Sequence, residues 1–201
     1  MKQLNQYIIE KFKINSKTTK QHYNYYPKDK DELKELINEL IEKRGYDADL
    51  NDIDTSQIED MTELFDGSQF NGDISKWDVS NVRTMIHMFN GSDFNGDISQ
   101  WNVSNVTSMQ CMFYHSKFNQ PLEYWDVSNV IDMHAMFAHS KFNKDISKWD
   151  VSKVEDMSDM FNGSKFNGNL ENWQVNDNAS TYDMFVGSPL KGKNNPSWYK
   201  K

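Results

Sequence analysis

The chain has 201 residues with a formal net charge of −8, and 13% of its residues are aromatic. The acidity, with no basic run to offset it, argues against binding to the phosphate backbone of nucleic acids. The many aromatic rings argue against a disordered chain, because disordered segments are poor in them. We therefore expect a folded, soluble protein whose partner is neutral or basic.

The start of the chain and its cysteine content bear on the compartment. The first residues contain no apolar run long enough for a signal peptide, and no later stretch approaches the roughly 18 apolar residues of a membrane helix. Cys111 is the single cysteine, so the sequence has no disulfide framework. These features predict a cytoplasmic protein.

Residues 1–49 form the first of three predicted regions. Residues 4–14 have the pattern of an amphipathic helix, residues 22–26 alternate enough for a short strand that Pro27 ends, and residues 28–45 predict a second helix. The apolar face of that helix consists of Leu33, Leu36, Ile37, Leu40 and Ile41. We interpret the region as a cap over the first repeat, since stacked repeats need covered ends, with a separate docking module as the alternative.

Residues 50–188 form the second region and repeat with a period of 24. Aromatic residues recur in fixed columns, among them Trp77, Trp101, Trp125, Trp149 and Trp173, and Phe65, Phe89, Phe113, Phe137, Phe161 and Phe185. Such regularity is typical of a solenoid whose units bury apolar residues against one another. Residues 189–201 lose the pattern, with Trp198 off register, and we interpret them as a C-terminal cap or tail.

Each unit combines two kinds of apolar spacing. The stretch from Trp77 to Val79 alternates as in a strand, whereas the apolar residues from Val82 to Phe89 are spaced as on one face of a short helix. Ser80 and Gly91 fit the N-cap and the end of that helix, the glycine with a positive φ. We therefore expect an α/β fold, a leucine-rich-repeat-like solenoid of short parallel strands and short helices with an N-terminal α/β cap.

The unit FNGDISKWDVSNV, followed by M-x-x-M-F, resembles the repeat of the BspA-like leucine-rich-repeat proteins, in the branch first noted in mycoplasma surface lipoproteins. The resemblance covers roughly residues 50–188. It implies a non-catalytic surface for adhesion or protein binding, and a place at the cell surface. The chain departs from the family in lacking a secretion signal and in carrying 49 residues ahead of the repeat.

The third and fourth units depart most from the repeat, and we expect a binding site there. Histidine replaces the glycine at His115 and His139, Tyr114 precedes the first of them, and His134 is expected on the outer face of the next helix. Tyr124 is expected on the strand face. Because Tyr offers contact area and a hydrogen bond at small entropic cost, we interpret these five residues as a protein-binding site. Neutral variation at exposed loops is the alternative.

Metal and cofactor sites have weaker support. Three histidines in neighbouring units invite a metal site, but no carboxylate or cysteine stands at a ligand spacing beside them. A calcium ladder along the Asp column is interrupted at Pro121 and Asn169, so we attribute the Asn and Asp columns to hydrogen bonds in turns. We expect no cofactor and no metal.

The motifs of common enzymes are missing from the sequence, so we expect no catalysis. The leading hypothesis is a non-catalytic protein-binding solenoid with an unidentified protein partner and neither a nucleic-acid partner nor a membrane segment. One alternative is a structural or assembly component that acts through residues 1–49. The other is an acidic inhibitor that imitates nucleic acid.

Overall fold

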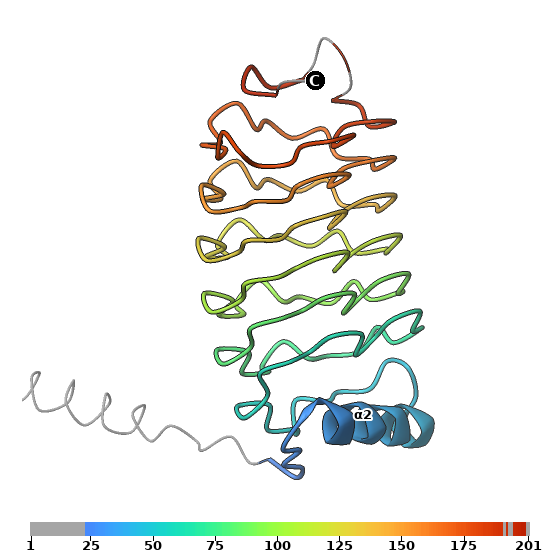
Figure 1. The fold of residues 1–201 in the computed structure, drawn as a ribbon. Coiled ribbons are helices and arrows are strands. Elements are labelled where there is room, and N and C mark those ends of the chain that lie inside the picture. The colour runs from blue at the N-terminus through green and yellow to red at the C-terminus, as the bar shows by residue number, and fades with distance from the viewer. Residues whose placement is uncertain (1–22, 191, 193–194, 200–201) are drawn as a thin grey trace, which may run out of the picture.

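The computed structural model describes residues 23–190, 192 and 195–199. The helix predicted over residues 4–14 lies outside the described residues. Within them, one α-helix, α2 (Lys30–Arg44), lies across one end of a stack of similar circuits of the chain (Figure 1). We call each circuit a coil. Residues 24 positions apart lie in neighbouring coils, as the hydrogen bond from Asn95 to Asn71 illustrates.

α2 matches the helix predicted over residues 28–45, and local signals hold both of its ends. The side chain of Asp29 accepts a hydrogen bond from the N–H of Glu32, and Gly45 ends the helix with a φ of 90°. Acidic residues stand in its first turn and basic residues in its last turn, which suits the helix dipole. The helix buries Leu33, Ile37 and Leu40 in the same core as the coils.

The repeats do not form the predicted α/β solenoid of parallel strands and short helices, and this prediction is wrong. Within the described residues the repeats contain no helix, and strand pairing is reduced to isolated parallel bridges: Asp49–Asp73, Asp60–Thr84, Thr84–Ser108, Ser108–Asp132, Asp132–Asp156 and Asp156–Ser180. Tyr25, in the segment predicted as a strand, forms only such a bridge, with Ile53. Turns and extended residues make up the coils.

Left-handed residues explain why the apolar stretch of each unit is not helical. One residue in its middle has a φ between 51° and 60° in every coil, namely Glu63, His87, Cys111, Ala135, Asp159 and Asp183. A second left-handed column follows four residues later, at Gly67, Gly91, His115, His139, Gly163 and Gly187. A single left-handed residue interrupts the right-handed α-helix, so the stretch forms successive turns. The positive φ predicted at the glycines is confirmed, but the helix before them is not.

Hydrogen bonds between coils replace those of helices and sheets. The N–H of Met61 donates to the carbonyl of Thr84, and the series continues as Met85 to Ser108, Met109 to Asp132, Met133 to Asp156 and Met157 to Ser180. Three parallel series begin at Glu63, Phe65 and Gly67, and all N···O distances lie between 2.7 and 3.0 Å. The carbonyl of Thr84 and the N–H of Met85 belong to one peptide group. The bonds therefore join into four continuous chains that run the length of the stack.

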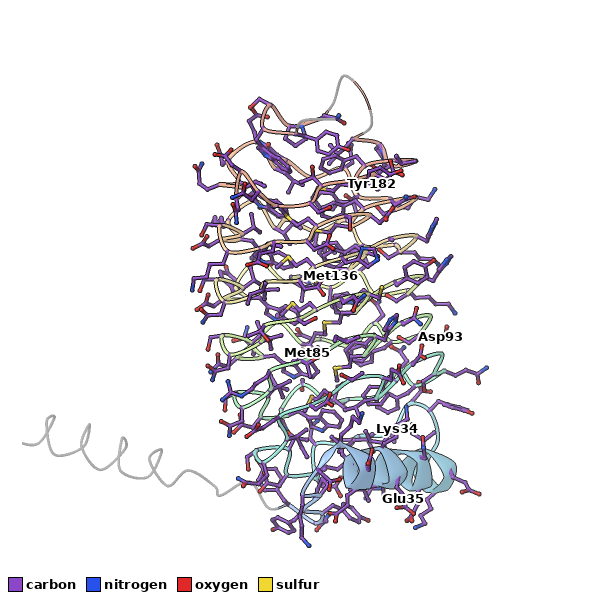
Figure 2. The ribbon with its side chains drawn as sticks, viewed as in Figure 1. Lys34, Glu35, Met85, Asp93, Met136 and Tyr182 are labelled. Atoms are coloured by element: carbon purple, nitrogen blue, oxygen red, sulfur yellow. The ribbon has the colours of Figure 1, made fainter. Side chains whose placement is uncertain are left out.

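The core consists of the predicted columns. Phe65 and Phe89 stack with ring centroids 5.5 Å apart, and the same column continues to Phe185 at comparable separations. Each buried indole N–H donates to a carbonyl of the preceding coil, from Trp77 to Leu50 and so on through Trp173 to Ile146. Methionines such as Met85 and Met136 fill the interior between the rings (Figure 2). The burial predicted for these columns is confirmed.

The polar columns hold turns and link coils. In the Asn column, the side chain of one Asn accepts a hydrogen bond from the backbone N–H of the next, which gives four bonds along Asn71, Asn95, Asn119, Asn143 and Asn167. Asp side chains accept from the N–H two residues later, as Asp73 does from Ser75 and Asp78 from Ser80. Ser80 is therefore part of a turn, and its assignment as a helix N-cap is wrong.

The two ends of the stack are covered differently. At the first end the ammonium group of Lys34 donates to the carbonyls of Glu63 and Leu64, with both N···O distances at 2.6 Å. At the other end Trp198 stacks on Trp173 and donates to the carbonyl of Leu170. Trp198 is off the sequence register by one residue, since it follows Trp173 by 25 positions, yet its ring still lies on the tryptophan column.

Candidate functional site

Tyr114, His115 and His139 form one cluster of rings on the outside of the stack, which we call the Tyr114 patch. The imidazoles of His115 and His139 are stacked, with centroids 4.6 Å apart and an interplanar angle of 14°. The Tyr114 ring meets both edge-on, at 4.5 Å from His115 and 5.7 Å from His139. Both histidines are exposed and Tyr114 is half-buried. The structure thus brings together three of the five predicted site residues.

The backbone positions the two imidazoles. His115 and His139 have φ values of 54° and 56° in the column that other coils fill with glycine. A left-handed conformation costs a non-glycine residue roughly 1–2 kcal/mol. The next residue of the column is Gly163, where a Cβ would overlap the imidazole of His139. The His139 ring therefore lies over Gly163, and the absence of a side chain there makes room for it.

Small residues beneath Tyr114 hold its ring in place. Tyr114 packs against a satellite cluster of Cys111, Ala135 and Ala138. Burial raises the pKa of the Cys111 thiol to about 11, and the carboxylates of Asp132 and Asp159 add to the effect. The thiol therefore stays protonated and acts as part of the packing rather than as a nucleophile.

His134 and Tyr124 lie apart from the Tyr114 patch. The Nδ1 atom of His134 forms a hydrogen bond with the hydroxyl of Ser158 at 2.8 Å, and the ring is half-buried in its own column. Tyr124 has 76% of its surface exposed, and no aromatic contact joins it to the patch among the described residues. It follows Tyr114 by ten positions in the coil, so the chain carries it to another side.

A column of lysines beside the patch escaped the sequence analysis. Lys117, Lys141 and Lys165 recur every 24 residues, two positions after His115, His139 and Gly163. All three side chains are exposed. The signal was the same 24-residue periodicity that identified the histidines, two positions further along the chain.

Among the described residues, neither a metal-binding group nor any of the better-formed pockets includes the residues of the Tyr114 patch. Within the described residues, no group of three or more His, Cys, Asp and Glu side chains could hold a metal ion. A cavity of about 820 Å³ lies between α2 and the first coil, lined by residues such as Lys34, Ile41, Tyr46 and Leu64. The patch is an open surface, which suits contact with a macromolecule better than enclosure of a small ligand.

The comparison with protein families matches the repeats. The family described as Mycoplasma protein of unknown function, DUF285, matches residues 34–140 and 114–198, which together span most of the chain. The chain belongs to the DUF285 family. Its membership places the repeats in a mycoplasma-associated family, whereas no finding identifies BspA-like leucine-rich repeats. No curated protein and no solved structure matches the chain.

A search for membrane spans adds one finding. Among the described residues of this DUF285 member, no helix is long and apolar enough to cross a membrane.

Proposed function

We propose that the protein is a non-catalytic binding module that holds a protein partner at the Tyr114 patch. The observation that carries this proposal is the exchange of glycine for stacked, exposed imidazoles in two neighbouring coils. Glycine suits the left-handed position better, so the two histidines persist against a backbone preference. Non-glycine residues fill the other left-handed column in every coil, but this column is glycine in four of its six coils, so the two histidines are exceptions, which supports binding over neutral variation.

The form of the patch supports a protein partner. Its three rings are held by their mutual contacts and by the small residues under Tyr114. Side chains already fixed before binding lose little conformational entropy when a partner covers them. Tyr is also enriched among the residues that contribute most to protein interfaces. The resemblance to BspA-like proteins, which implies a binding surface, points in the same direction.

The experiment is affinity capture from a lysate of the native host with the proteins retained identified by mass spectrometry. The test variant Tyr114→Asn/His115→Gly/His139→Gly restores residues that other coils carry at these positions. The control is Tyr124→Gln, which removes an exposed Tyr from another side in favour of the residue of the preceding coil. We expect a stoichiometric partner that the test variant loses and the control keeps. A partner retained by the test variant would refute the proposal.

Stability separates loss of binding from loss of folding. Glycine accepts the left-handed conformation, so the two histidine replacements should offset part of the packing lost with the Tyr114 ring, and the test variant should still unfold cooperatively in urea. A test variant that loses the partner while staying folded assigns the loss to the surface itself. A partner lost only when α2 is disrupted would instead favour the role of residues 1–49 in assembly.

A further inference from the structure

The lysine column beside the Tyr114 patch gives this acidic protein a local positive stripe. The backbone N–H groups of Lys117, Lys141 and Lys165 donate to serine carbonyls of the preceding coil, at N···O distances of 3.1 to 3.3 Å. The three residues are thereby held in neighbouring coils, about 4.8 Å apart as in other parallel backbone pairings. We call this set the lysine stripe.

The lysine stripe and the Tyr114 patch share one face. His115 and Lys117 flank the buried Ser116, and His139 and Lys141 flank the buried Ser140 in the same way. Because the serine between them is buried, the histidine and the lysine both lie on the outside of the stack, two residues apart along the chain. The lysines therefore stand beside the imidazoles, coil by coil.

The charges of the stripe are incompletely balanced within the protein. The ammonium group of Lys117 forms an ion pair with Asp93 at 2.7 Å. Lys141 and Lys165 form no ion pair within the described residues. Like charges that stand side by side in neighbouring strands of chain repel each other, and an anion that bridges them relieves the repulsion. Two adjacent unbalanced cations thus favour an anionic ligand.

We infer that the partner bound at the Tyr114 patch presents an acidic peptide segment, whose carboxylates pair with Lys141 and Lys165 while its neighbouring residues cover the rings. This inference rests on the proposed function and adds the chemistry of the partner. It replaces the expectation of a neutral or basic partner that the net charge suggested. Charges farther than about 8–10 Å away are largely screened at physiological salt, so the local stripe outweighs the total charge.

A peptide fits the stripe better than a nucleic acid does. An extended peptide advances about 3.4 Å per residue, so carboxylates two or three residues apart span the distance between lysines in neighbouring or next-neighbouring coils. A nucleic acid needs a larger basic surface, because its affinity comes mainly from many phosphate contacts. Here the half-buried Asp93 stands in the same column one coil before Lys117 and pairs with it, so the free positive charge is confined to two coils and is short for a long polyanion.

The test measures binding of a fluorescein-labelled hexaglutamate peptide by fluorescence anisotropy at low salt. The variant Lys141→Gln/Lys165→Gln removes two charges from the stripe. Its matched control, Lys76→Gln/Lys148→Gln, removes two exposed lysines of another column and gives the same net charge. We expect the stripe variant to bind about tenfold more weakly than the native protein, and the control to stay within about twofold.

Several results would overturn the inference. If both variants bind hexaglutamate more weakly by the same factor, the total charge of the protein and not the stripe explains the binding. If the native protein does not bind hexaglutamate, the inference of an acidic ligand is refuted. A labelled hexathymidylate oligonucleotide that binds as tightly as the peptide would point to nucleic acid instead. If the captured partner is lost in the Tyr114 patch variant but kept by the stripe variant, the proposed function stands and the acidic segment does not. A partner kept by both variants refutes the proposed function itself.

Discussion

His139 and Gly163 show how single residues shape the outer surface of the stack. The two are neighbours in one left-handed column, and the imidazole of His139 occupies the space above the glycine. At Gly91 in the same column, by contrast, an added Cβ would meet only the Cα of Gly67 at 3.9 Å. How well this backbone position tolerates a side chain therefore depends on the residue that occupies the same position in the preceding coil.

This difference predicts the effect of alanine at the two glycines. Both Gly91→Ala and Gly163→Ala pay the cost of a left-handed alanine, but only Gly163→Ala also displaces an imidazole. We expect Gly163→Ala to lower the free energy of unfolding by about 1 kcal/mol more than Gly91→Ala, measured by urea denaturation. In a His139→Gly background the extra loss should vanish. Equal losses in the native background would contradict the position of the His139 ring.

Cys111 offers a second test at the residue scale. The residue is 8% exposed, and burial raises the pKa of its thiol to about 11. Only about one thiol in a thousand is ionised at pH 8 for such a pKa, and the thiolate is the reactive form. We expect Ellman's reagent to react slowly with the folded protein at pH 8 and rapidly in urea. Tyr114→Ala, which uncovers the thiol, should accelerate the reaction without urea, whereas Tyr124→Ala should not.

α2 is the element that ties residues outside the repeat to the first coil. Its apolar face joins the core, and Arg44 in its last turn pairs with both carboxylate oxygens of Asp52 at 2.9 Å. Hydrogen bonds from Arg44, with a further one from Asn24, lower the pKa of Asp52. The ammonium group of Lys34 donates a hydrogen bond to the carbonyl of Leu64. The equivalent carbonyl in the next coil is that of Met88, and it accepts a hydrogen bond from the N–H of Phe65 in the coil before it. α2 thus supplies a donor where no coil precedes.

Replacement of Lys34 tests this role of α2. Burial lowers the pKa of Lys34, which is the effect of bringing an ammonium group against the first coil. In Lys34→Met the carbonyl of Leu64 keeps its position but loses its donor, so we expect the free energy of unfolding to fall by about 1–3 kcal/mol. The control Lys43→Met removes an exposed lysine whose ion pair, among the described residues, is with Glu39 along the helix, and it should change stability by less than about 0.5 kcal/mol. Equal effects would contradict the proposed role.

At the scale of the whole molecule, the periodicity predicted which side chains are buried but not the path of the backbone. Val82, Met85, Met88 and Phe89 are all buried, as expected for one face of a helix. The same spacing also fits consecutive turns. These turns are closed by backbone hydrogen bonds such as that from the N–H of Met88 to the carbonyl of Met85. The left-handed residue that decides between them is His87, a residue type that carries no turn signal as strong as glycine.

The site was predictable to the extent that it follows the columns. His115 and His139 share a column, so their contact could be expected from the period alone. Tyr124 could not be placed relative to them, because its side of the coil depends on the bends between positions 114 and 124. The lysine stripe was visible in the sequence, but its importance depends on Lys141 and Lys165 forming no ion pair within the described residues. That fact requires the folded arrangement.

The four hydrogen-bonded chains between coils make the stack electrically polar. Every peptide group in them points its C=O toward α2 and its N–H away from it, so their dipoles of about 3.5 D add as they do in an α-helix. Lys34 places a cation at the carbonyl pole. At the opposite pole the N–H groups of Thr181, Asp183, Phe185 and Gly187 donate to no acceptor among the described residues. The stack therefore has a negative pole, which a cation covers, and a positive pole at its other end, and every coil must enter it in the same orientation.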